Sequence, residues 1–506
     1  MRLYEGNILT CDKENQIAHY LLEDQGKILY CGDELPAGCV AAERVSTGEG
    51  ALIPPFVDSH IHFASYATFH AGLNVMNARS NEEILQMLQE HLKKTKEKLV
   101  IGFGASPYSV SDGHLVCRVQ LDEVCPDKPL FLVKYDGHAC VVNTVLLNEV
   151  RGKVQHLRGF HEDYITASLS TVQLVAHMQK ALDDLAARGI GMIHTVSGVG
   201  FARDLDVDLE RFFARGITNG MQMRVFMQTL DVNKAVKRKL PRIGGCFETA
   251  LDGCFGSMDA ALLSPYENTS DCGVLYYSDE KVTEFCKAAN RAGLQIEMHA
   301  IGDKAFVQAV RAIKAALDDL PREDHRHTII HACLPTAEEI AVCERYHINL
   351  AVQTAFIDWP QEPDSYLEQI LGERAGRLNP IRTFCEHGLI LSAGSDGPCT
   401  DPDPLLWMYK ACNHSNPAES ISVQQALRMC TYNGYYTTFD ERERGSLEAG
   451  KIADMVLLDR NPYDIPKEEL ASVKVKQLYL RGQEYKKGNG GGAAQILRGM
   501  IKRGKC

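Results

Sequence analysis

Residues 53–63 read IPPFVDSHIHF, an apolar stretch that ends in two histidines, His60 and His62. In a β-strand, side chains two positions apart project from the same face, so the two imidazoles share one side of the strand. Burying two imidazoles at the end of an apolar strand costs free energy unless they bind a common partner. The stretch therefore predicts a buried strand that presents a pair of metal ligands at its carboxyl end.

Short apolar runs of the same kind recur along the chain. Amphipathic stretches such as 279–292 and 304–317, which fit helices, separate most of these runs. Alternating strands and helices are typical of an α/β protein whose parallel sheet closes into a (β/α)₈ TIM-type barrel. The eight expected barrel strands are 53–59, 191–196, 223–228, 246–251, 295–299, 328–331, 349–353 and 389–393.

Some parts of the chain fall outside the barrel repeat, which is expected to span 53–443. About 130 residues separate the first two strands, far more than the roughly 30 residues of one βαβ unit. We therefore expect 64–188 to be a large insertion that builds a pocket wall or a lid. The two ends, 1–52 and 444–487, carry short strand-like runs and are expected to form one small β-sandwich. The glycine-rich, basic residues 488–506 are expected to be a flexible tail.

Three more of the expected strands lead into residues of metal-binding type. His299 occurs in IEMHAIGD, His331 in TIIHA and Asp396 in LSAGSD. In a barrel the carboxyl ends of the strands converge on one rim, where active sites of this fold are built. Imidazole and carboxylate are ligands of zinc and related ions. The four strand ends together predict a site for one or two divalent ions, with zinc as the expected metal.

Composition narrows the classes of partner. The 506 residues are 45% hydrophobic and 24% charged, as in globular proteins. A formal net charge of −12 disfavours nucleic acid as a partner. Charged residues interrupt the first 15 positions, and no apolar run approaches the ~20 residues that span a bilayer. We expect a cytoplasmic protein that acts on a small molecule and binds no membrane; a homo-oligomer is left open.

The chain has 17 cysteines and no pair with C-x-x-C spacing. Most are therefore expected to be small buried hydrophobes in a reducing compartment. Cys254 and Cys399 lie close in sequence to the site motifs.

Beyond these motifs, four longer stretches resemble the family 3 amidohydrolases, the branch that includes N-substituted formamide deformylases. They are 136–147 (DGHACVVNTVLL), 251–266 (LDGCFGSMDAALLSPY), 394–404 (GSDGPCTDPDP) and 445–458 (GSLEAGKIADMVLL), and the resemblance extends to about Lys487. It implies a metal-dependent hydrolase in which Asp396 is the general base. It also implies that the metal ligands are His60, His62, His299, His331 and Asp396.

The chain departs from the family pattern at the end of the fourth strand, where the amidohydrolase superfamily, to which that family belongs, often has a lysine whose carbamate bridges two metals. Glu248 stands in that place and is expected to bind metal, with the same charge but a reach shorter by roughly 3 to 4 Å. Either the backbone at Glu248 lies closer to the metals than in the family, or the site binds one ion instead of two. The resemblance also places His138, from the DGH motif, against substrate or metal. Asp252 and Asp303 are expected beside the substrate, where they could also orient metal ligands.

These expectations describe hydrolysis of an amide-like C–N bond (amide, N-formyl, lactam or carbamate) by metal-activated water. One alternative is an aminohydrolase that deaminates a heterocycle. Mononuclear deaminases of the superfamily use a glutamate soon after the fifth-strand histidine, and residues 300–303 contain none. Another alternative is a non-catalytic scaffold derived from a hydrolase. Such scaffolds typically lose ligands, whereas here the set is complete apart from the change to Glu248.

Overall fold

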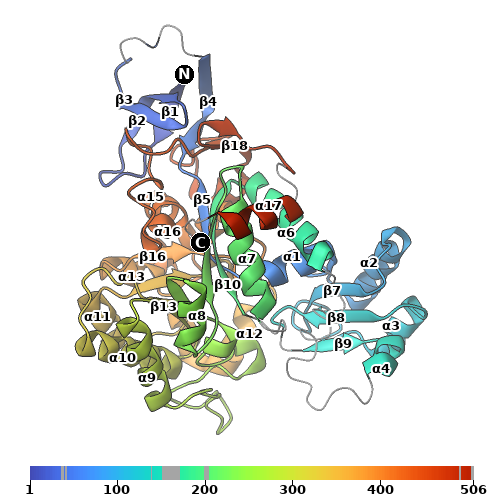
Figure 1. Cartoon of the computed structure of the whole chain (residues 1–506). Helices are drawn as coiled ribbons and strands as arrows, with labels where there is room; N and C mark the ends of the chain where they lie inside the picture. The colour runs from blue at the N-terminus through green and yellow to red at the C-terminus, as the bar shows by residue number, and fades with distance from the viewer. Residues whose placement is uncertain are drawn as a thin grey trace.

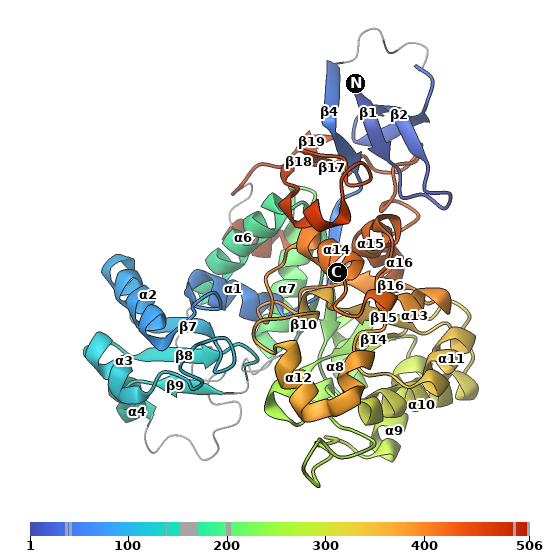
Figure 2. The ribbon, with the colours of Figure 1, turned by 180° about the vertical axis from the view of Figure 1, so that it is seen from behind.

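The computed structural model describes residues 1–35, 39, 43–137, 139–150, 171–198, 204–488, 492–502 and 506. Figures 1 and 2 show a barrel, a lobe built from the insertion on one side, and a sheet at one end that holds strands from the N-terminal and C-terminal parts of the chain, while the C-terminus itself lies beside the barrel. Within the described ranges, no helix has the length and apolar character needed to span a bilayer.

The barrel is a parallel sheet of eight strands whose neighbours follow one another in chain order. The strands are buried on both faces, which is why they read as apolar runs rather than alternating ones. The predicted (β/α)₈ architecture is confirmed. Its strands are β5 (Phe56–Ile61), β10 (Ile190–Ser197), β11 (Gln222–Met227), β12 (Arg242–Gly245), β13 (Gln295–Ala300), β14 (Thr328–His331), β15 (Asn349–Val352) and β16 (Leu391–Ala393).

The barrel closes between its first and last strands. The Ser59 hydroxyl donates to the Ala393 carbonyl at 2.8 Å. Just beyond β16, Ser395 donates to the Asp58 carboxylate through its backbone N–H at 2.9 Å and through its hydroxyl at 2.6 Å. These bonds tie β5 to the loop that follows β16.

The fourth strand differs from its prediction, which was 246–251. β12 ends at Gly245, and the expected strand is instead the short 3₁₀ turn η3 (Phe247–Thr249) and a loop. Gly244 and Gly245 have φ of 107° and 132°, and a Cβ at either position would collide with Glu297 or Val196. Glycine is depleted in strands and marks close approach of backbones, so a pattern search for apolar runs passes over this strand.

Helices cover the outside of the barrel. α10 shows the pattern, since Phe306, Val310, Ile313 and Leu317 recur at helical spacing and are buried. The covering helices include α7 (Leu205–Gly216), α8 (Val232–Arg238), α9 (Asp279–Arg291), α10 (Asp303–Asp319), α11 (Ala337–Tyr346), α13 (Ile381–Glu386), α14 (Pro404–Cys412), α15 (Val423–Cys430) and α16 (Tyr432–Thr437).

The insertion forms a lobe with its own four-stranded sheet, in the order β6 (Leu73–Asn74), β7 (Val100–Ala105), β8 (Leu130–Lys134) and β9 (Cys140–Val142). Its helices include α2 (Asn81–Lys94), α3 (Arg118–Val124) and α4 (Thr144–Val150), while α1 (Phe63–Ala71) and α6 (Thr171–Ala187) pack together beside the barrel. The lobe meets a barrel loop through Gln361, whose side chain donates to the Met76 carbonyl at 2.9 Å.

The two chain ends share one seven-stranded sheet, as expected for a unit built from both termini. β4 pairs with β1 on one side and with β17 on the other, which joins the halves. The strands are β1 (Arg2–Leu9), β2 (Ile17–Asp24), β3 (Lys27–Gly32), β4 (Glu43–Ile53), β17 (Met455–Leu458), β18 (Val475–Leu480) and β19 (Gln483–Glu484).

Part of the tail at 488–506, which was predicted to be flexible, is helical in the described residues. Residues Gly492–Ile501 form helix α17, which lies against α7 (Figure 1). Gly216 and Gly499 let the two helices approach closely, because a Cβ at either position would meet the backbone of the partner helix. Gln495 is completely buried in this contact. The contact depends on this close approach at Gly216 and Gly499, since Leu497, Met500 and Ile501 of the same helix are exposed.

Candidate metal centre

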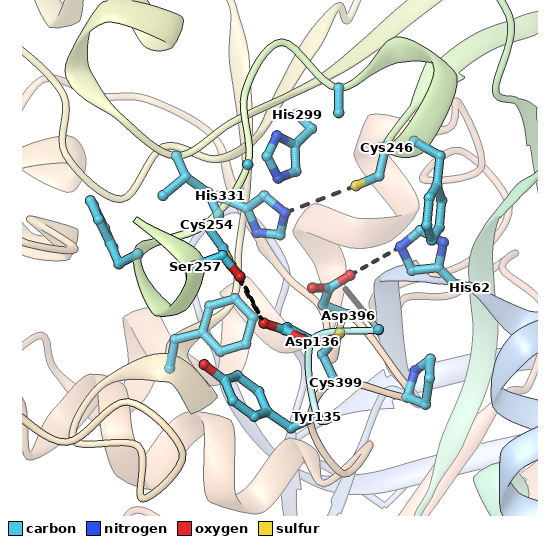
Figure 3. Close-up of a pocket in the computed structure, with 18 of the residues that line it drawn as sticks. His62, Tyr135, Asp136, Cys246, Cys254, Ser257, His299, His331, Asp396 and Cys399 are labelled. Atoms are coloured by element: carbon cyan, nitrogen blue, oxygen red, sulfur yellow. Dashed lines mark hydrogen bonds and ion pairs between the residues drawn. The ribbon is translucent and has the colours of Figure 1, made fainter. Parts of the chain in front are cut away.

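The carboxyl ends of the barrel strands meet at one rim, where most of the predicted ligands lie (Figure 3). His60 lies near the end of β5 and His62 just after it, His331 ends β14, and Asp396 follows β16. His331 and Asp396 have φ of 70° and 53°, a left-handed conformation that residues other than glycine rarely adopt. Backbone held in this region is typical of functional sites, where the surrounding fold imposes it.

Four buried side chains converge at this rim. The ligand atoms of His60, Cys246, His331 and Asp396 all lie within 4.8 Å of one another. His60 Nε2 is 3.2 Å from Asp396 Oδ1 and 3.3 Å from Cys246 Sγ. The same sulfur is 3.9 Å from His331 Nε2. His62 joins the group through Asp396, since its Nε2 is 3.2 Å from the same Oδ1.

His299 lies beside the cluster. Its ring centroid is 4.6 Å from that of His331, and its Nδ1 is 3.3 Å from Asp252 Oδ1. A carboxylate at the second ring nitrogen commonly orients a metal-binding histidine. Asp252 is itself fixed, because it accepts hydrogen bonds of 2.8 to 3.0 Å from the backbone N–H groups of Ala261, Ile301 and Gly302.

His331 is oriented in a comparable way. Its Nδ1 is 2.6 Å from Gln353 Oε1. The Gln353 amide nitrogen donates to the Ala351 carbonyl at 3.3 Å, which is consistent with the amide oxygen facing His331. Because that oxygen only accepts, His331 carries its hydrogen on Nδ1 and presents the lone pair of Nε2 to the cluster.

Burial sets the protonation of the cluster. It lowers the pKa of His60, lowers that of His331 well below its usual value, and raises the pKa of the Cys246 thiol well above its usual value. Burial also acts to raise the pKa of Asp396, but hydrogen bonds from His60 and His62 outweigh it and hold that pKa well below its usual range. At neutral pH the cluster therefore presents the neutral imidazoles of His60 and His331 and the ionised carboxylate of Asp396.

These residues fit a divalent ion. A tetrahedral ion with nitrogen and oxygen ligands at ~2.0 to 2.2 Å and sulfur at ~2.3 Å keeps its ligand atoms about 3.3 to 3.8 Å apart. Three of the six separations between the ligand atoms of the cluster are 3.2, 3.3 and 3.9 Å, and all six are within 4.8 Å. Lone-pair donors that face one another at these distances are stabilised by a cation among them.

The structure does not bring Glu248 to this cluster. The turn that follows β12 carries Glu248 to the exposed rim of the cavity, where its backbone carbonyl accepts a 2.7 Å hydrogen bond from the Tyr277 hydroxyl. The ligand-type residue at the end of β12 is Cys246, which sequence reasoning missed. In the sequence, Cys246 is marked only by its position directly after Gly244 and Gly245. Among 17 cysteines this is weak evidence for a metal ligand.

The three residues predicted to lie beside the substrate have different positions. Asp252 lines the cavity above the cluster and contacts His299. Asp303 begins α10 and accepts a 2.7 Å hydrogen bond from the Leu263 backbone N–H, so it holds a loop and does not line the cavity. His138 lies outside the described residues.

The cluster opens into a cavity of about 830 Å³. Its wall is rich in aromatic rings, from Phe69, Phe103, Tyr135, Phe247, Phe255, Tyr276, Phe356 and Trp359. Of the described residues that line it, those with charged side chains, histidines aside, are all acidic: Asp136, Glu248, Asp252, Asp259, Glu362 and Asp396. Cys254 and Cys399 also line it.

A closed parallel barrel that gathers histidines and an aspartate beside such a cavity defines a class of proteins built to hold a divalent ion next to a small molecule. The chain belongs to the amidohydrolase family, whose sequence model matches residues 48–485. The resemblance inferred from the motifs is thereby confirmed.

Individual relatives are distant but cover most of the chain. The N-substituted formamide deformylase of Arthrobacter pascens is 23% identical over 95% of this chain and 97% of its own. The protein LONG AFTER FAR-RED 3 of Arabidopsis thaliana is 24% identical over 95% and 90%. A solved structure of an uncharacterized metal-dependent hydrolase from Pyrococcus horikoshii OT3 superposes with a TM-score of 0.73 at 22% identity, covering 92% of this chain and 99% of that one.

Proposed function

We propose that this protein hydrolyses an amide-like C–N bond (amide, N-formyl, lactam or carbamate) in a small molecule, with zinc as its divalent ion. The observation that carries the proposal is the convergence of His60, His331 and Asp396 on one point that opens into the cavity. His62 and His299 stand beside that point. The formamide deformylase among the relatives supports this class of bond.

When bound, a divalent ion polarises a carbonyl and lowers the pKa of water, which supplies the nucleophile at neutral pH. Asp396 is placed to take the proton of the attacking water, since it is ionised and 7% exposed at the floor of the cavity. The same carboxylate then passes the proton to the departing nitrogen. His62 holds the Asp396 oxygen from the side and limits its rotation.

Hydrolysis of a panel tests the proposal. N-formyl and N-acyl amines, lactams and aryl carbamates should include at least one compound that the zinc-loaded protein cleaves, with loss of activity in chelator and recovery on adding zinc. Adenine, cytosine and guanine analogues should release no ammonia. Metal-dependent ammonia release with no amide cleaved would assign the protein to the deaminases instead. Absence of both metal and turnover would leave a non-catalytic scaffold.

The cavity favours neutral or cationic substrates over anionic ones. Glu362 lies among aromatic rings, with its Oε1 accepting from the Tyr135 hydroxyl at 2.9 Å. The Tyr135 and Trp359 ring centroids are 5.0 Å apart, and those of Phe356 and Trp359 are 4.9 Å apart. A carboxylate beside aromatic faces attracts a cation and repels an anion, by ~2 kcal/mol at about 8 Å and an effective dielectric of 20.

We therefore expect an N-formylbenzylamine with a carboxylate on its ring to show a kcat/KM about 10- to 30-fold below that of the unsubstituted compound. A quaternary ammonium group on the ring should not lower it. Burial raises the pKa of Glu362 to about 7, so this carboxyl is neutral below that pH and charged above it. The preference for the cation should grow between pH 6 and pH 8, and Glu362→Gln should flatten that growth. Equal kcat/KM for all three compounds would contradict this selectivity.

A further inference from the structure

The end of β12 holds a cysteine where the predicted ligand was Glu248. Cys246 Sγ is buried and points into the cluster (Figure 3). It is 3.3 Å from His60 Nε2 and 3.9 Å from His331 Nε2, and it lies within 4.8 Å of an Asp396 oxygen. None of the residues predicted from the motifs supplies a ligand from this strand.

We propose that Cys246, as a thiolate, is a ligand of the ion that His60, His331 and Asp396 hold. The site is then a mixed nitrogen, oxygen and sulfur centre for one soft divalent ion. The inference rests on the proposed function, because it concerns the same metal centre. It adds a fourth protein ligand and the class of metal, and water or substrate would take a fifth position on the ion.

The backbone holds Cys246 in this position from both sides. Its N–H donates to Gln228 Oε1 at 2.8 Å, and its carbonyl accepts from both the N–H and the hydroxyl of Thr249 at 3.0 Å. Gly245 before it has a φ of 132°, which L side chains rarely adopt. The chain is therefore bent at the point that turns the sulfur toward the histidines.

Charge balance supports a single ion. One thiolate and the Asp396 carboxylate together neutralise the two positive charges of a divalent ion, so the buried centre carries no net charge while the imidazoles stay neutral. Binding of the ion releases the thiol proton to solvent, as it does at other thiolate sites. A ligand set with a thiolate selects zinc, cobalt or cadmium over magnesium, calcium or manganese, which prefer oxygen ligands.

Cobalt substitution tests the inference with a readout that does not depend on turnover. The cobalt-loaded protein should show a sulfur-to-cobalt charge-transfer band in the near ultraviolet. Cys246→Ser should lose the band, and Cys246→Asp should lose the band but keep bound cobalt, because aspartate supplies an oxygen ligand. Cys254→Ser is the matched control: Cys254 also lines the cavity, but its sulfur is 3.9 Å from an Asp136 oxygen rather than in the cluster, so the band should remain.

Two further measurements extend the test, and the first of them needs no variant. X-ray absorption on the wild-type zinc protein should show one sulfur neighbour at ~2.3 Å. Competition with a chelator should show that Cys246→Ser binds zinc more weakly by over about 10²-fold, more than loss of an outer partner costs. Bound cobalt with active hydrolysis but without a sulfur band or sulfur neighbour would overturn this inference alone. A wild-type protein that binds neither zinc nor cobalt would overturn the proposed function with it.

Discussion

Replacing Asp396 with asparagine is expected to lower kcat by about 10²- to 10⁴-fold, the range for loss of a general acid/base. Asparagine keeps the shape of the side chain but cannot take a proton from water. Most of the bound metal should remain, because His60, His331 and Cys246 still face the ion. The measurement is kcat on the best substrate of the panel, together with zinc content by elemental analysis.

Asp318→Asn is the control for this experiment, since Asp318 is an exposed aspartate on α10 that pairs with Lys314 at 2.6 Å on the outer surface. It should leave kcat and zinc content unchanged. Undiminished turnover of any wild-type substrate by Asp396→Asn would remove Asp396 from the base role. Loss of all zinc from the same variant would show that its main contribution is to hold the ion.

Replacing Asp252 with alanine is expected to lower the free energy of unfolding by about 3 to 5 kcal/mol. The carboxylate is fully buried and accepts from three backbone N–H groups, so its removal leaves buried donors without acceptors. Urea unfolding of the metal-free protein, followed by the fluorescence of Trp359 and Trp407, gives the comparison. Zinc affinity should also fall, because His299 loses the oxygen 3.3 Å from its Nδ1.

The matched change is Asp271→Ala. Asp271 also accepts from a backbone N–H, that of Gly273 at 3.0 Å, but it does so on the exposed part of the neighbouring loop. Its loss should cost less than about 1 kcal/mol. If the Asp252 and Asp271 variants unfold at the same urea concentration as wild type, the carboxylate of Asp252 contributes little to the fold.

The sequence was sufficient to predict those strands whose position follows from a local apolar pattern. The strand that leads to His60 and the strands that carry His299 and His331 at or near their ends are buried on both faces. They are therefore short and mostly apolar, and their order predicts one rim. β12 could not be predicted in this way. Its last residues, Gly244 and Gly245, allow close approach to neighbouring strands, where any side chain would collide, so they give no apolar signal.

That difference at β12 changed the candidate ligand. The strand was expected at 246–251, four residues later than β12, so Cys246 was taken as its first residue and Glu248, which matches the family's lysine position, was taken as the ligand. Only the three-dimensional position of the sulfur, 3.3 Å from His60, separates Cys246 from the other cysteines. Helix α17 was missed for a related reason, because its fit against α7 depends on Gly216, a residue 276 positions before it.

The bond between Asp58 and Ser395 joins residues 337 positions apart. His60 and His62 leave the ribosome early, whereas Asp396 is made after nearly all the rest of the barrel. Contacts of such high sequence separation form slowly, because loop closure precedes the gain from the contact. The ion can find its full set of ligands only once the last strand has closed against the first. Metal uptake during refolding should therefore lag behind the formation of secondary structure, and the bound ion would report completion of the barrel.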